Sequence, residues 1–204
     1  MKRQETQGPG VTRSVRVRGG RKGVSLAVAI LVGSMALGGC EDSFQQSWVS
    51  VPDTVSLFSL SRPELNLPSA YSFRERRAYR VEGPNSTGSW DIALDTRAGA
   101  LVFLPPSVLG IQSRAGIAPL TDAVFAEVDR APSDTAAYVK ADVVSAEIGR
   151  VYVVQTGATP GTFGGTCVRY AKLEPVEMDP EAGFLSFLFD ANPVCNDRRL
   201  IPPD

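Results

Sequence analysis

The sequence has no histidine among its 204 residues, and this absence excludes several kinds of functional site. Without an imidazole the chain has no Ser-His-Asp triad, no Cys-His nucleophile pair and no histidine ligand for zinc, copper or haem iron. An excess of positive charge is also missing, because 21 Lys and Arg stand against 22 Asp and Glu. Nucleic-acid-binding proteins usually carry a basic excess, so we expect no nucleic-acid partner.

Hydrophobic runs long enough to cross a membrane as a helix are absent too. The apolar run at residues 24–37 has 14 residues, whereas a membrane-spanning helix needs about 20. With 43% hydrophobic residues, 19 Gly and 15 Pro, the composition is nevertheless typical of a folded globular protein. The length allows one domain or two small ones.

The first 39 residues have the layout of a secretory signal. They contain seven basic side chains and one acidic side chain, followed by the apolar run and two glycines. The residues Leu37-Gly38-Gly39-Cys40 resemble a bacterial lipobox, and the resemblance implies cleavage before Cys40 and lipidation of its thiol. An ordinary secretory signal followed by a chance cysteine is the alternative.

We therefore predict a lipoprotein signal peptide at residues 1–39, a lipidated cysteine and tether at residues 40–54, and a folded domain at residues 55–204. The processed chain would have 165 residues, with 14 basic and 21 acidic side chains and a net charge of −7. Because an anionic membrane repels an acidic domain, the acyl chains rather than charge must hold it there. The expected location is the bacterial cell envelope, facing the periplasm or the cell surface, with the membrane as a partner.

Short apolar runs separated by glycine and proline predict an all-β fold with a single antiparallel β domain. The expected strands cover residues 55–60, 78–82, 89–95, 100–104, 150–156, 167–178 and 184–191. Residues 107–120 and 157–166 have the composition of loops. Residues 120–127 are compatible with a short strand or one helical turn, and residues 131–146 show no clear pattern.

Residues 89–95 alternate as a half-buried strand does. Trp90, Ile92 and Leu94 are expected on one face, with Asp91 and Asp95 on the opposite, solvated face. On such a strand the two carboxylates lie roughly 13 Å apart, beyond the spacing of about 5–9.5 Å that glycosidases use. We predict that the protein is not an enzyme.

Two runs, residues 167–178 and 184–191, flank turn-forming residues and predict a long β-hairpin. The alternation of the first run slips by one position near Pro175, which indicates a β-bulge. The expected partners are Met178 with Leu185, Val176 with Phe187, Glu174 and Pro175 together with Leu188, Leu173 with Phe189, and Ala171 with Ala191.

The same register, continued away from the turn, places Cys167 opposite Cys195. Facing strand residues have Cα separations of roughly 4.5–5.5 Å, which suits a disulfide. Export to an oxidising compartment would permit the bond. We predict a Cys167–Cys195 disulfide, and two free thiols are the alternative.

Five short segments form an ordered set. They are Gly-Ser-Trp-Asp-Ile-Ala-Leu at 88–94, Ser-Arg-Ala-Gly-Ile at 113–117, Val-Tyr-Val-Val-Gln-Thr at 151–156, Tyr-Ala-Lys-Leu at 170–173 and the run at 184–189. In order and spacing, over roughly residues 55–191, they resemble the HmuY-like haem-binding lipoproteins. The resemblance implies an all-β, lipid-anchored domain at the cell envelope.

That family holds haem iron between two axial side chains, histidine in some members and methionine in others. The chain has no histidine, and its single methionine after the signal, Met178, is expected on a buried face, so no axial ligand transfers. Five tyrosines are possible iron ligands in principle but are expected to be packing residues: Tyr71, Tyr79, Tyr138, Tyr152 and Tyr170. We expect no cofactor and no metal site.

The predicted function is that of a membrane-anchored, non-catalytic envelope lipoprotein that binds an unknown small ligand or an envelope protein. Loops 105–120 and 157–166 are candidates for its binding edge, because loops on a rigid scaffold often carry function. Plain connection is the alternative for both loops. Two other functions stay open: haem binding through a tyrosine ligand, and a structural or assembly role in the envelope.

Overall fold

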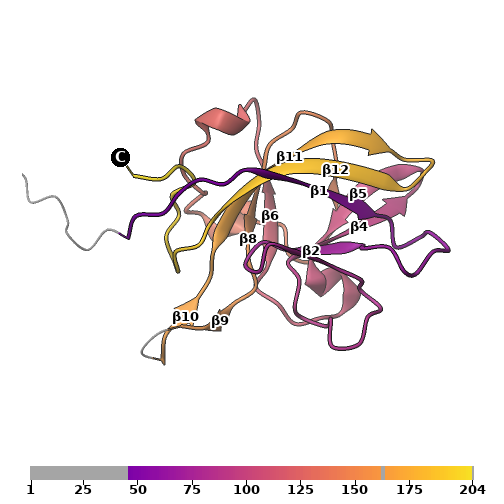
Figure 1. Cartoon of the computed structure of the whole chain (residues 1–204), viewed down its shortest axis with the longest axis horizontal. Coiled ribbons are helices and arrows are strands. Elements are labelled where there is room, and N and C mark those ends of the chain that lie inside the picture. Colours follow the sequence, from indigo (N-terminus) through magenta and orange to yellow (C-terminus); the bar gives the residue numbers. More distant parts are fainter. Residues whose placement is uncertain (1–45, 162–163, 204) are drawn as a thin grey trace, which may run out of the picture. The chain divides into compact units, whose positions relative to one another are not determined.

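Two five-stranded sheets share one apolar core in the computed structural model (Figure 1), which describes residues 46–161 and 164–203. The first sheet has the order β1 (Asp53–Phe58), β12 (Phe184–Asn192), β11 (Tyr170–Asp179), β8 (Tyr152–Gln155), β6 (Gly116–Pro119). The second has the order β3 (Arg77–Tyr79), β2 (Ala70–Ser72), β4 (Ile92–Arg97), β5 (Ala100–Leu104), β7 (Val144–Ser145). All the pairings are antiparallel, so the predicted all-β fold is confirmed.

Smaller elements connect the strands of the two sheets. A third pairing joins β9 (Thr159–Pro160) to β10 (Thr166–Cys167). Single turns of 3-10 helix lie at Pro106–Leu109, Phe125–Glu127 and Thr135–Ala137. By sequence, residues 120–127 are compatible with a short strand or one helical turn, and the turn at Phe125–Glu127 shows that they contain a helical turn. Residues 107–120 are not a loop throughout, because β6 pairs with β8.

The main core lies between the two sheets. Alternate residues of β12, namely Leu185, Phe187 and Phe189, point into it. Tyr71 and Phe73 contribute from the second sheet and the turn after β2, with their ring centroids 5.1 and 5.6 Å from that of Phe189. Such aromatic contacts between layers fix how the sheets pack.

The outer face of the second sheet is covered as well. Trp90, Ala93 and Leu104 belong to a second apolar cluster, whereas Ile92 and Leu94 belong to the main core. The prediction that Trp90 shares a face with Ile92 and Leu94 is therefore wrong. The reason is that β4 begins at Ile92, so the two-residue alternation does not extend back to Trp90.

The predicted hairpin of β11 and β12 is present, but its bulge lies elsewhere. The register is confirmed for Met178–Leu185, Leu173–Phe189 and Ala171–Ala191. Pro175 pairs with Phe187 and Glu177 pairs with Ser186, so Val176 is the extra residue and not a partner of Phe187. Val176 is 48% exposed, whereas Pro175 is buried. The apolar ring of Pro175 packs inward, and the bulge after it turns Val176 outward.

Candidate functional site

A cavity of about 380 Å³ opens where the segments entering β4 and β6 meet the segment leaving β8. Its lining comprises Arg74, then Gly88, Ser89 and Asp91 before β4, Gln112, Ser113 and Arg114 before β6, and Gly157, Ala158 and Thr159 after β8. We call this cavity the Asp91 pocket. Its volume lies in the range of about 300–1,000 Å³ that small-molecule sites usually occupy.

Asp91 is the buried polar centre of this pocket, with 5% of its surface exposed. One carboxylate oxygen, Oδ1, accepts a hydrogen bond from the Gly157 N–H at 2.8 Å, and Oδ2 accepts one from the Phe73 N–H at 2.8 Å. The Asp91 N–H donates to the Tyr71 carbonyl at 2.8 Å. The prediction of a solvated Asp91 is therefore wrong. The residue lies before β4 and ties three segments together by backbone bonds.

Burial also changes the acidity of this group. Desolvation raises the pKa of Asp91 from 3.8 to about 6, although the Gly157 and Phe73 N–H groups and the Arg74 charge oppose the rise. None of the ion pairs among residues 46–161 and 164–203 includes Asp91. The carboxylate is thus desolvated and hydrogen-bonded, but it has no counter-ion in contact.

Gly157 brings its backbone close to the pocket floor. A Cβ added there would lie 3.4 Å from Ser113 Oγ and 3.7 Å from Asp91 Oδ1, which is ordinary contact. The preceding residue is clamped, because the Thr156 N–H donates to the Arg169 carbonyl and the Arg169 N–H donates to Thr156 Oγ1, both at 2.9 Å. A larger side chain at position 157 would therefore fill the pocket from a fixed backbone.

The pocket wall that contains Arg114 presents positive charge. The Arg114 carbonyl accepts a hydrogen bond from Gln155 Nε2 at 3.2 Å, so the backbone of this wall is held by β8. The Arg114 side chain is exposed and belongs to none of the ion pairs found within the described ranges. Arg74 contributes a second guanidinium, which pairs with Glu75 at 2.9 Å.

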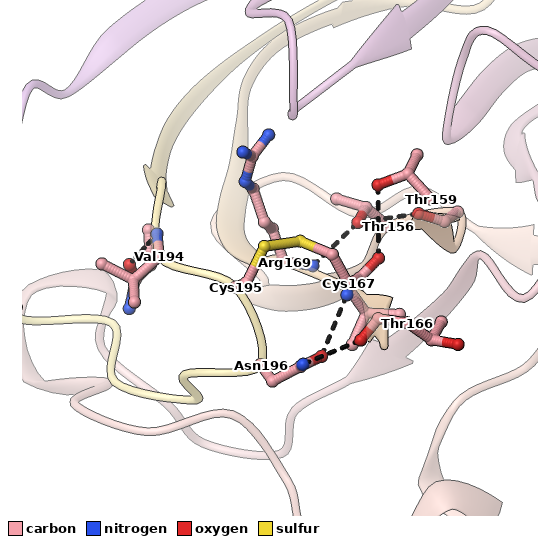
Figure 2. Close-up of a disulfide and its surroundings, with 11 residues drawn as sticks. Thr156, Thr159, Thr166, Cys167, Arg169, Val194, Cys195 and Asn196 are labelled. Atoms are coloured by element: carbon pink, nitrogen blue, oxygen red, sulfur yellow. Dashed lines mark hydrogen bonds between the residues drawn. A yellow bond between two sulfur atoms is a disulfide. The ribbon is translucent and has the colours of Figure 1, made fainter. Parts of the chain in front are cut away.

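The two predicted cysteines meet beside this region (Figure 2), with their Cα atoms 5.1 Å apart and their sulfurs at bonding distance. Asn196 follows Cys195, and its side chain donates to the Thr166 carbonyl at 2.8 Å and accepts from the Val168 N–H at 3.1 Å. The bond joins the chain after β12 to β10. β10 pairs with β9, which contains Thr159 of the pocket wall.

Both loops expected to form a binding edge contribute to the pocket. Loop 105–120 supplies Gln112, Ser113 and Arg114, and loop 157–166 supplies Gly157, Ala158 and Thr159. Asp95 lies apart from it, where it pairs with Arg97 at 3.3 Å. Glu174 and Glu177 are outside the pocket lining. Cys40 and the predicted signal peptide lie outside the described residues.

None of the five tyrosines is in the described lining of the Asp91 pocket, although Tyr79 lines a separate cavity beside β3. Tyr71 and Tyr152 are buried in the main core, and burial raises the pKa of each to about 12. The Tyr152 hydroxyl donates to the Ser145 carbonyl at 2.8 Å, and the Tyr138 hydroxyl donates to the Pro132 carbonyl at 3.1 Å. The lining described above contains no tyrosine, and Met178 is half-buried against the core.

Two other cavities have no buried charged side chain such as Asp91 among the residues described for them. A cavity of about 380 Å³ beside Gly149 and one of about 480 Å³ beside β3 have charged side chains only at exposed or half-buried positions among their described lining. Within residues 46–161 and 164–203, no group of three or more Cys, Asp or Glu side chains is placed to hold a metal ion. The same part of the chain contains no helix long and apolar enough to cross a membrane.

Sequence reasoning missed Arg74, Ser89 and Asp91 as pocket residues. Strict alternation, extended past the start of β4, places Asp91 in solvent, and Arg74 follows a strand of three residues that carries almost no periodic signal. No protein-family model matches this chain, and no curated protein sequence is similar to it.

Proposed function

We propose that the protein is a lipid-anchored, non-catalytic binding protein of the bacterial cell envelope that takes a small polar ligand in the Asp91 pocket. The observation that carries the proposal is a buried carboxylate, bonded to the Gly157 and Phe73 N–H groups, in a cavity of about 380 Å³ that is lined mainly by three chain segments. Two of those segments are the loops that the sequence favours as a binding edge. The lipobox at Leu37–Cys40 supports the anchor.

The contacts of Asp91 support binding rather than catalysis. Each carboxylate oxygen already accepts a backbone N–H, so the group is held in place by the fold. Among the described lining residues it is the single carboxylate, whereas hydrolysis by acid–base catalysis usually needs a second titratable group. Two arginines and several hydroxyl and amide groups complete a surface suited to polar recognition.

The resemblance to HmuY-like proteins supports the same location of the site. Two of the segments that carry the resemblance, residues 88–94 and 113–117, also line the pocket. The ligand differs from haem in this proposal, because the lining described here carries Asp91 and two arginines and contains no histidine, methionine or tyrosine. A polar ligand fits the arginines and Asp91 better than an apolar porphyrin face would.

The anchor is tested by expressing the full chain in a bacterium with labelled palmitate. We expect label on the protein, a mass that corresponds to cleavage before Cys40, and recovery in the membrane fraction. The Cys40→Ser variant should lose label and membrane recovery together. Unlabelled wild-type protein in the cytosol would contradict the anchor.

The pocket is tested by thermal unfolding of the processed protein in detergent against a panel of small polar compounds. A ligand at 100 times its Kd stabilises a protein by about 2.7 kcal/mol, which is a measurable rise in Tm. Gly157→Leu is the matched control, because its side chain fills the pocket and leaves every charge in place. Rises that are equal in both proteins would place binding elsewhere.

A further inference from the structure

The Asp91 pocket carries charges of both signs, and these charges suggest the class of ligand. Asp91 provides a negative group that is 5% exposed and lies outside every ion pair of the described residues. A buried charge that has hydrogen bonds but no counter-ion in contact is still costly, and a cation that reaches it recovers part of that cost. A ligand with an ammonium group would supply the missing cation, using the remaining lone pairs of Oδ1 and Oδ2.

The arginines define the second requirement. Arg114 carries an exposed guanidinium at the pocket wall and is fixed at its backbone by Gln155, and Arg74 adds a second positive charge to the lining. Guanidinium groups bind carboxylates through paired N–H donors. A ligand with only an anionic group would be attracted by the arginines but repelled by Asp91. A ligand with only an ammonium group would be attracted by Asp91 but repelled by the arginines.

We infer that the Asp91 pocket binds a small molecule that carries both a primary ammonium group and a carboxylate, with the ammonium at Asp91 and the carboxylate at Arg114. This inference rests on the proposed function, because it names the ligand class of the same pocket. Free amino acids and short ω-amino acids belong to the class.

The rest of the lining agrees with a compact polar ligand. The described part of the lining contains no aromatic side chain, so it offers no face on which a sugar ring or a nucleobase could stack. Ser89, Gln112 and Thr159 supply neutral polar groups, which suit a ligand without a large apolar part. The cavity of about 380 Å³ leaves room for a short chain between the two charged ends.

The test is calorimetric titration of the processed protein in detergent at pH 7.5. The probes are glycine, β-alanine and 4-aminobutyrate, which carry both charges at increasing separation, with propionate and propylamine as single-charge controls. We expect at least one of the doubly charged probes to bind at least tenfold more tightly than either control, because each control lacks one charge-assisted interaction.

Three variants assign the contacts. Gly157→Leu should abolish binding of every probe. Arg114→Gln should weaken binding of the doubly charged probe about tenfold and leave propylamine unchanged. Arg80→Gln, which removes an exposed arginine outside this pocket, should change neither. Circular dichroism and Tm establish that each variant is folded.

The outcomes separate the ligand class from the binding role. Binding of propionate or propylamine as tight as that of the doubly charged probes, and lost in Gly157→Leu, would overturn the ligand class and leave the proposed binding pocket intact. Failure of all five probes would overturn the ligand class as well, and the binding role would then fall only if the thermal panel also yields no ligand sensitive to Gly157→Leu.

Discussion

The two ends of the β11–β12 hairpin are held in different ways. At the turn end, neighbours in sequence pack together, as Met178 does opposite Leu185, and Gly183 adopts a φ of 61° against Ser59 and Arg62. At the other end, a disulfide joins Cys195 to Cys167, and Arg169 before β11 is bonded to Thr156, the neighbour of Gly157 in the Asp91 pocket. Apolar packing dominates near the turn, whereas the polar end lies beside the cavity that we propose as a binding site.

The largest expected effect comes from the apolar side of this comparison. Phe187→Ala removes a fully buried ring that packs between the sheets, and we expect the free energy of unfolding to fall by about 3–5 kcal/mol. Val176→Ala is the matched control, because Val176 is exposed at the bulge, and it should change stability by less than about 0.5 kcal/mol. Urea denaturation measures both. Similar losses in the two variants would contradict the position of the bulge.

The disulfide should contribute nearly as much at the polar end. Closing a loop with a sequence separation of 28 residues stabilises a fold by about 3–4 kcal/mol in the chain-entropy model. Urea denaturation with and without reductant should show a loss of that size. In a thiol assay on the unfolded Cys40→Ser protein, thiols should react only after reduction, and two reactive thiols without reductant would show that the bond does not form.

A somewhat smaller effect is expected from the pH dependence of Asp91. Its pKa is higher in the folded state, so folding takes up a proton between about pH 4 and pH 6, and stability falls as the pH rises through that interval. The shift from 3.8 to about 6 corresponds to about 3 kcal/mol. The Tyr79 hydrogen bond lowers the pKa of Glu75, whose contribution is therefore lost only at more acidic pH.

Asp91→Asn separates this contribution from the rest, because it keeps the size of the side chain and removes the titration. Urea midpoints measured from pH 4 to pH 7 should decline for the wild type and stay nearly level for the variant. Parallel curves would show that Asp91 is solvated in the folded protein.

The difference between the two ends also explains what the sequence could predict. The run at 100–104 coincides with β5, and the hairpin register follows from alternating apolar residues, because both depend on neighbours within a few positions. The bulge was misplaced because Pro175 was not expected to pack inward. β2 and β7 were missed because strands of three and two residues are too short to show a period.

The pocket depends on contacts between residues distant in sequence, which the pattern of apolar and polar residues along the chain does not predict. Its two loops could be nominated from their composition, but Asp91 is tied to the loop after β8 and to the turn after β2 only through the backbone N–H groups of Gly157 and Phe73. Because the donors are backbone N–H groups, these bonds require no particular side chain at either donor residue. They therefore cannot be predicted from the residue types in the sequence. The cysteine pairing, by contrast, could be predicted from the strand register, because the chain has only 3 cysteines and the register places Cys167 opposite Cys195.

The most direct test of the account is a two-dimensional amide NMR titration of the processed protein with β-alanine at pH 7.5. The N–H groups of Gly157 and Phe73 donate to the two oxygens of Asp91, so an ammonium group that approaches this carboxylate must change their resonances. We predict that these two signals shift most, together with those of Ser113 and Arg114, and that the hairpin turn stays unchanged. A shift confined to residues outside the pocket, or none at saturating probe, would contradict the assignment of Asp91 as the binding group.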